Sequence, residues 1–173
     1  VMITTDKCYE NREQNHAYTE DEPMGGYDPY SSSKGADEIA ISSWRRSFMN
    51  PAEYAKHGKA IASVRAGNVI GGGDFASDRI IPDCVRAVTN GQDIIVRNPF
   101  STRPYEHVLE PVAAYLMIAQ KQYEDIKYAD YYNVGPDECD CVTTGDLVDL
   151  FCKYWGEDAT WENVAEKDAP HEA

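Results

Sequence analysis

The sequence predicts an α/β fold. Short runs rich in β-branched and apolar residues alternate with longer segments in which apolar residues recur every three or four positions. Glycine and proline mark the boundaries between these segments. With 173 residues, of which 42% are hydrophobic and 27% charged, the chain has the size and composition of one globular domain or slightly more.

The first part of the chain predicts a strand, a long loop and a helix. Residues 1–5 form an apolar, β-branched run typical of an interior strand, so an unpaired edge there is an expected weak point for folding and aggregation. Residues 6–29 are polar and contain several glycines and prolines, which predicts a long loop. Apolar residues have helical spacing from residue 30 to 49, and Asn50-Pro51 ends the helix.

The remaining elements alternate in the same way. We expect strands at residues 60–66, 93–96, 130–134 and around Trp161, an extended piece at 103–108, and helices at 80–89, 110–123 and 143–155. A glycine-rich loop is expected to follow the strand at 60–66. Thr143 and Asp146 have the spacing of a capping box, with aspartate in place of the usual glutamate.

The composition excludes several classes of partner. Sixteen basic residues against thirty acidic ones give a formal net charge of −14, which argues against binding to nucleic acid or to an anionic membrane surface. No apolar run approaches the roughly 20 residues of a membrane-spanning helix, and no signal-like segment opens the chain. Five irregularly spaced cysteines fit a reduced, cytoplasmic protein. Cys139 and Cys141 lack further ligands nearby, which favours ordinary thiols over a metal site.

Two short segments carry chemistry. Tyr30 and Lys34 lie four residues apart and share one helical face, where an ammonium group favours the phenolate that acts as a general acid or base. An exposed tyrosine beside a solvated lysine is the simpler interpretation of that spacing. Thr5, Asp6 and Lys7 follow the first strand, and ligands of open α/β sheets bind at the carboxyl ends of strands. Turn chemistry also explains a threonine and an aspartate there.

These segments belong to an ordered series of motifs. The series comprises Thr4-Thr5-Asp6-Lys7, Asp28-Pro29-Tyr30-Ser31-Ser32-Ser33-Lys34, Arg65-Ala66-Gly67-Asn68-Val69-Ile70-Gly71-Gly72-Gly73-Asp74, Asp78-Arg79-Ile80-Ile81-Pro82 and Arg103-Pro104-Tyr105-Glu106-His107-Val108. It resembles the extended short-chain dehydrogenase/reductase superfamily, and within it the nucleotide-sugar 4,6-dehydratases, most closely those acting on CDP-glucose. The resemblance covers nearly the whole chain.

The resemblance implies the C-terminal part of a Rossmann-like doubly wound sheet plus a smaller α/β substrate-binding domain, with NAD as cofactor. Residues 1–66 correspond to the C-terminal part of the NAD-binding domain. Residues 67–173 correspond mainly to the substrate-binding domain, with helix 110–123 and strand 130–134 returning to the sheet. Members of the family begin with a glycine-rich turn that cradles the NAD pyrophosphate. This sequence has no such fingerprint, so we expect it to represent the second half of such an enzyme and to be inactive alone.

The family's catalytic roles fall on five residues. The resemblance implies that Tyr30 removes the proton from the hydroxyl at sugar carbon 4, while Lys34 holds the nicotinamide ribose and tunes Tyr30. Thr5 would bind the reacting hydroxyl, and Asp6 would protonate the hydroxyl that leaves carbon 6. The dTDP-glucose members carry glutamate as the base toward carbon 5, and Lys7 stands at that position here. Lys7 acts as a base only in its neutral form, which burial or positive neighbours favour.

Binding roles come from the same resemblance. Arg79 and Arg103 match positions near the substrate diphosphate, Asn68 matches a substrate-contacting amide, and His171 resembles a histidine of a C-terminal motif whose arginine is absent here. We interpret His107 as a structural residue. The resemblance therefore implies a small nucleotide-sugar as the partner. Helix 30–49 often packs at a dimer interface in the superfamily, which implies a homodimer or homotetramer for the full-length enzyme; a core helix is the alternative.

Two further functions compete with a dehydratase. A nucleotide-sugar epimerase of the same superfamily is one of them, but epimerisation needs no acid for a leaving hydroxyl, so Asp6 favours the dehydratase. A non-catalytic fragment is the other, because the sequence lacks the NAD-binding fingerprint.

Overall fold

The computed structural model describes residues 1–12, 16–156 and 158–165. The chain forms two compact units. Residues 1–69 and 106–135 make up the first unit, and residues 70–105 with the described residues from 136 onward make up the second. Because the chain leaves the first unit and returns to it, segments distant in sequence share one sheet.

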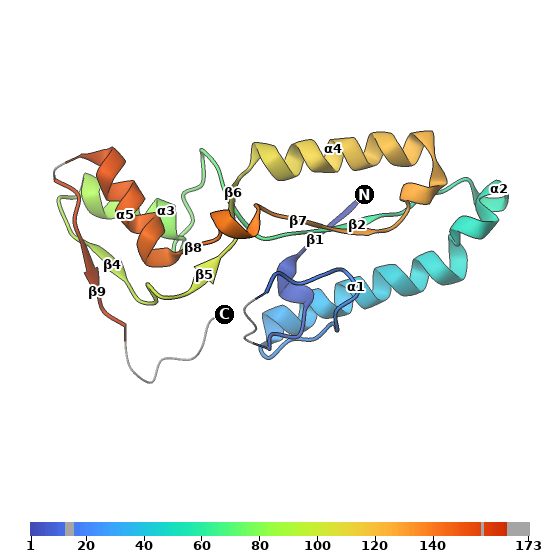
Figure 1. Cartoon of the computed structure of the whole chain (residues 1–173), viewed down its shortest axis with the longest axis horizontal. Coiled ribbons are helices and arrows are strands. Elements are labelled where there is room, and N and C mark those ends of the chain that lie inside the picture. Colours follow the sequence, from blue (N-terminus) through green and yellow to red (C-terminus); the bar gives the residue numbers. More distant parts are fainter. Residues whose placement is uncertain (13–15, 157, 166–173) are drawn as a thin grey trace. The chain divides into compact units, whose positions relative to one another are not determined.

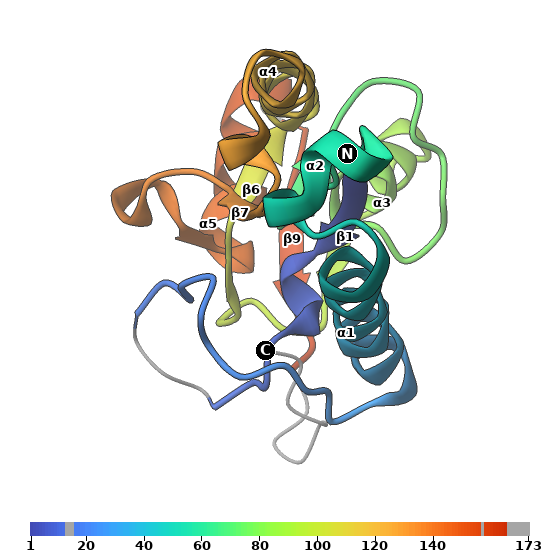
Figure 2. The ribbon, with the colours of Figure 1, turned by 90° about the vertical axis from the view of Figure 1, so that its right-hand side faces the viewer.

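The first unit is built on three parallel strands in the order β1 (Met2–Thr5), β2 (Ser63–Ala66) and β7 (Tyr131–Val134). Thr5 pairs with Ala66, and Ala66 pairs with Val134, so the three carboxyl ends are level. Helices α1 (Pro29–Phe48) and α4 (Leu109–Glu124) cover opposite faces of this sheet (Figures 1 and 2). The smaller elements are η1 (Asp6–Cys8), η2 (Pro51–Glu53), α2 (Tyr54–His57) and η3 (Ile126–Tyr128). Strands β3 (Asn68–Ile70) and β6 (Tyr105–His107) pair with each other, and Ile70 and Tyr105 are counted in the second unit.

The second unit packs two helices on a small parallel ladder. Its elements are α3 (Ile80–Thr89), β4 (Ile94–Val96), β5 (Thr102–Arg103), η4 (Glu138–Asp140), β8 (Val142–Thr143), α5 (Thr144–Trp155) and β9 (Trp161–Asn163). The core of this unit consists of the fully buried side chains of Cys84, Ile94, Val96 and Val148. The predicted capping box at the start of α5 is confirmed, because Thr143 and Asp146 exchange both side chain–backbone hydrogen bonds.

The α/β class is confirmed, but burial differs from the sequence pattern. The first strand has the apolar sequence of an interior strand, but among the described residues β1 pairs only with β2 and Ile3 is 63% exposed, so the unpaired edge expected at residues 1–5 is observed. The apolar residues that mark the helix at 30–49 are also largely exposed, since Trp44 and Phe48 are 58% and 64% exposed. The face of α1 that is buried carries Gly35, Glu38 and Arg45 instead. Part of the predicted glycine-rich loop forms strand β3.

Candidate active site

The carboxyl end of β1 has a defined hydrogen-bonding geometry. Thr5 ends the strand and caps η1, because its Oγ1 accepts the backbone N–H of Lys7 at 3.3 Å. The same hydroxyl donates to Asp6 Oδ1 at 2.8 Å. A hydroxyl has one proton and two lone pairs, so one lone pair of Thr5 is left for a further donor. Thr5, Asp6 and Lys7 are all partly buried.

The start of α1 carries the second group. Asp28 caps the helix by accepting the backbone N–H groups of Tyr30 and Ser31 at 2.8 and 3.0 Å, and the Ser31 hydroxyl holds the pKa of that carboxyl below its usual value. The phenol of Tyr30 is exposed, and Lys34 Nζ lies 5.4 Å from its ring centroid. Lys34 Nζ also lies 3.8 Å from a carboxylate oxygen of Asp37. The spacing of four thus brings the phenol and the ammonium group together.

A glycine lets the two groups approach one another. Helix α1 packs against η1, and a Cβ atom on Gly35 would lie 3.3 Å from the carbonyl oxygens of both Cys8 and Gly25. A larger side chain would push the helix away from this segment. Gly35 directly follows Lys34, so the close approach sets the first turns of α1 beside the end of β1. In the sequence only the glycine itself, unusual inside a helix, points to this contact.

A buried polar network lies behind these groups, and the sequence analysis missed it. The Arg65 Nη2 and Glu38 Oε2 atoms form a salt bridge of 2.7 Å, and each side chain is only 3% exposed. Burial by itself raises the pKa of the Glu38 carboxyl, but hydrogen bonds from Arg65, Thr4 and Ser63 outweigh it and the pKa is lowered. Two features of the sequence point to this network: an arginine within an apolar strand, and a glutamate one helical turn after Lys34.

The remaining predicted binding residues are spread over the chain. Asn68 lies in β3 of the first unit and is partly buried. In the second unit, Arg79 is exposed at the N-cap of α3, and Arg103 lies in β5, opposite Val142 of β8. His171 lies outside the described residues. His107 is exposed, and its Nδ1 accepts the backbone N–H of Leu109 at 3.3 Å.

A family model matches residues 1–135 of the chain, and it is described as the NAD dependent epimerase/dehydratase family. The chain belongs to this family. The chain is 53% identical to the CDP-glucose 4,6-dehydratase of Salmonella typhimurium. The aligned region covers the whole of this chain and 48% of that enzyme. The resemblance to nucleotide-sugar dehydratases is therefore confirmed, and the chain spans about half the length of this relative.

Solved structures have the same fold at low sequence identity. The dTDP-glucose 4,6-dehydratase of Bacillus anthracis, in complex with NAD, matches 95% of this chain and 49% of its own with a TM-score of 0.75 and 19% identity. The UDP-N-acetylglucosamine 4-epimerase of Methanobrevibacter ruminantium, in complex with UDP-N-acetylmuramic acid, matches 96% of this chain and 50% of its own with a TM-score of 0.73 and 18% identity. The Rossmann-like fold class is thereby confirmed.

The start of α1 fits the ribose end of NAD. The family is NAD dependent, and Lys34 offers an ammonium donor beside an exposed phenol, a donor set suited to ribose hydroxyls. The phosphate-cradling fingerprint does not occur in the printed sequence. Over the part of the chain that the structure describes, no cluster of three or more histidine, cysteine or acidic side chains is arranged to hold a metal ion. The described helices include none with the length and apolar character needed to cross a bilayer.

Proposed function

We propose that this chain carries the acid–base and sugar-binding half of a CDP-glucose 4,6-dehydratase. The reaction converts CDP-glucose to CDP-4-keto-6-deoxyglucose and water, and it needs an NAD-binding segment in addition to these residues. The observation that carries the proposal is the threonine–aspartate pair at the end of β1, held against the helix of Tyr30 and Lys34 by the close approach at Gly35. The 53% identity over the whole chain supports the choice of substrate.

Oxidation at carbon 4 comes first in this proposal. Bound NAD supplies a reversible hydride acceptor. Tyr30 takes the proton of the carbon 4 hydroxyl as the hydride departs from that carbon, and Lys34 stabilises the phenolate and binds the nicotinamide ribose. Thr5 hydrogen-bonds the reacting hydroxyl by turning its own proton, directed to Asp6 in this structure, to the carbon 4 oxygen as Tyr30 takes the proton of that hydroxyl.

Loss of water follows. The ketone at carbon 4 acidifies the proton at carbon 5, which Lys7 removes as a neutral amine. Asp6, as a carboxylic acid, donates its proton to the hydroxyl leaving carbon 6, and water departs. Lys7 returns its proton to carbon 5 as the hydride returns to carbon 6. Tyr30 loses its extra proton to solvent and Asp6 regains one from solvent, so the side chains end in their starting states and the cofactor would end oxidised. The partly buried position of Asp6 and Lys7 suits proton transfers that exclude bulk water.

Substrate binding falls to the residues that match family positions near the substrate. Arg79 and Arg103 neutralise the diphosphate, which a chain of net charge −14 can hold only at a local cationic site. Asn68 and His171 complete the proposed contacts. The exposed apolar residues Trp44 and Phe48 of α1 support assembly of the full-length enzyme into a homodimer or homotetramer.

The test is an assay of the complete gene product that carries this chain. With CDP-glucose and NAD⁺ it should form a 4-keto-6-deoxy sugar nucleotide, detected by its mass, 18 Da below the substrate, and by reduction to the deoxysugar. UDP-glucose and dTDP-glucose are matched comparisons for the base. Formation of a 4-epimer of unchanged mass would establish an epimerase instead. The 173-residue chain alone should show neither turnover nor tight NAD binding.

A further inference from the structure

We propose that Glu38 and Arg65 act as a positioning pair that sets helix α1 along the sheet, and thereby sets Tyr30 and Lys34 relative to the end of β1. The proposal rests on the proposed function, because it concerns the same acid–base groups. The pair itself touches neither substrate nor cofactor in this mechanism.

One carboxylate joins the helix to two strands. Glu38 Oε1 accepts the hydroxyl of Thr4 on β1, and Glu38 Oε2 accepts the hydroxyl of Ser63 on β2 at 3.0 Å and Nη2 of Arg65 at 2.7 Å. Thr4 and Arg65 are register partners in the ladder between these strands. The Glu38 carboxylate therefore holds α1 at a single point where two paired strands meet.

The contact between Glu38 and Thr4 lies close to the proposed catalytic groups on both elements. On α1, Glu38 is one helical turn after Lys34. Tyr30, Lys34 and Glu38 recur every four residues, so they follow one another along one side of α1. Thr4 immediately precedes Thr5. A slip of α1 by one residue moves Tyr30 by about 1.5 Å, and a misplacement of about 1 Å is enough to slow an aligned reaction on the order of 100-fold.

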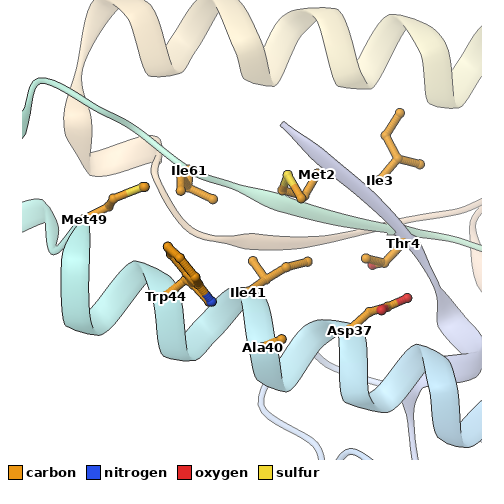
Figure 3. A pocket seen from close by; sticks show the side chains of 9 residues that line it. All are labelled: Met2, Ile3, Thr4, Asp37, Ala40, Ile41, Trp44, Met49 and Ile61. Carbon is orange, nitrogen blue, oxygen red and sulfur yellow. The ribbon is translucent and has the colours of Figure 1, made fainter.

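The other contacts between α1 and β1 are mainly apolar. The nearby space between α1 and β1 is an open groove of about 550 Å³, lined mainly by apolar side chains, among them Ile41 and Trp44, with Thr4 next to Asp37 at one end (Figure 3). Apolar contacts are non-directional, so they hold the helix on the sheet without fixing its position along it. The directional hydrogen bonds of Glu38 supply that position.

Arg65 is itself immobilised from several sides. Its Nη1 donates to the Tyr9 hydroxyl at 2.6 Å and to the carbonyl of Glu20 at 3.1 Å, and its guanidinium lies 5.2 and 5.0 Å from the ring centroids of Tyr9 and Tyr131. A buried ion pair adds little net stability over an apolar pair of similar volume, because both ions lose their hydration. What an apolar pair lacks is the fixed geometry, and this difference makes the role testable.

The test compares variants of the complete gene product. The double variant Glu38→Met/Arg65→Met removes both charges together and leaves no unpaired ion. We expect kcat for CDP-glucose to fall by about 10- to 100-fold, with KM nearly unchanged and the unfolding midpoint modestly lowered, because the buried Ser63 hydroxyl loses its acceptor. Thr4→Val is a milder variant that removes one hydrogen bond to Glu38 and should lower kcat several-fold, while Thr4→Ser should restore it.

Arg45→Met is the matched control. Arg45 lies on the same helix and forms a 3.1 Å salt bridge to Asp130, but it follows Lys34 by eleven residues. This variant should lower the unfolding midpoint and leave kcat unchanged. A double variant with the kcat of the wild type, or a kcat loss in Arg45→Met as large as in the double variant, would overturn the positioning role.

A second readout separates the inference from the proposed function. Amide hydrogen exchange at residues 5–9 and 29–36 should accelerate in the double variant and not in Arg45→Met, whatever the substrate of the enzyme. Unchanged exchange would reject the positioning pair. A wild-type enzyme that leaves CDP-glucose unconverted would reject the proposed function alone, and the exchange data would still decide the positioning role.

Discussion

Gly26 lies against the first turn of α1 so closely that a Cβ atom on it would be 2.1 Å from the amide nitrogen of Ser32. The carbonyl of Gly26 also accepts the Ser32 hydroxyl at 2.9 Å. The loop before α1 is therefore clamped to the turn that carries Tyr30, and only the absence of a side chain permits it.

Replacement of Gly26 by alanine should destabilise the protein. Backbone atoms cannot yield as the end of a flexible side chain can, so we expect a loss of about 1–3 kcal/mol in unfolding free energy and a fall in kcat as the first turn shifts. Chemical denaturation and turnover measure the two effects. Gly135→Ala is the control, because a Cβ atom at Gly135 would meet nothing within 4 Å. Equal stability of the two variants would contradict the clamp.

Tyr30→Phe should abolish hydride transfer. Phenylalanine keeps the ring beside Lys34 but removes the group that accepts the carbon 4 proton, so the transient NADH absorbance that the wild type gives in a single turnover with CDP-glucose and NAD⁺ should be absent. Tyr27→Phe is a suitable control, because Tyr27 is a fully exposed tyrosine just before the same helix. Retained turnover in Tyr30→Phe would remove Tyr30 from the mechanism.

Asp6→Asn should separate the two halves of the reaction. Asparagine cannot protonate the leaving hydroxyl, so oxidation at carbon 4 should proceed while loss of water stops. Rapid quenching followed by mass analysis should detect a 4-keto sugar nucleotide that keeps its oxygen at carbon 6. The normal 4-keto-6-deoxy product at the wild-type rate would show that Asp6 is not the acid.

The stability contribution of Glu38 should depend on pH. Since the pKa of the folded carboxyl lies below its usual value of 4.5, its stabilisation is fully present above that pH and is lost as pH falls through the lower, folded value. The stability difference between wild type and Glu38→Gln should therefore be largest near pH 7 and shrink below pH 4.5. Glu53→Gln, which breaks an exposed pair with Lys56, should cost little at either pH. A difference that is constant from pH 7 to pH 3 would argue against the lowered pKa.

The cysteines should differ sharply in reactivity. Burial raises the pKa of the Cys8 and Cys84 thiols to about 12, so at pH 8 only about one in ten thousand is a thiolate, and neither sulfur is accessible. Cys139 is exposed and should react with iodoacetamide first. Mass analysis of peptides gives each rate, and unfolding in denaturant should make the rates similar. Labelling of Cys8 as fast as Cys139 in the native protein would contradict the fold of the first unit.

Most elements follow from local sequence. The helix at 80–89 is observed with the predicted bounds, and the one expected at 143–155 forms at Thr144–Trp155 behind its predicted cap. Apolar periodicity and capping act within a few residues, so they can be recognised without the rest of the chain. Burial could not be predicted in the same way. Ile3 and Trp44 are apolar but exposed, because burial depends on which distant segment covers a side chain.

In the candidate site, too, some features are local in the sequence and others depend on distant segments. The sequence alone determined the groups with chemical character, namely Thr5 and Asp6 after a strand and Tyr30 with Lys34 on one helical face, because spacing and residue type are local properties. Only the tertiary structure decided what holds them in place. The approach of Gly35 to Cys8 and the pairing of Glu38 with Arg65 join segments about 27 residues apart in sequence, and such contacts exist only once strand register and helix packing are formed.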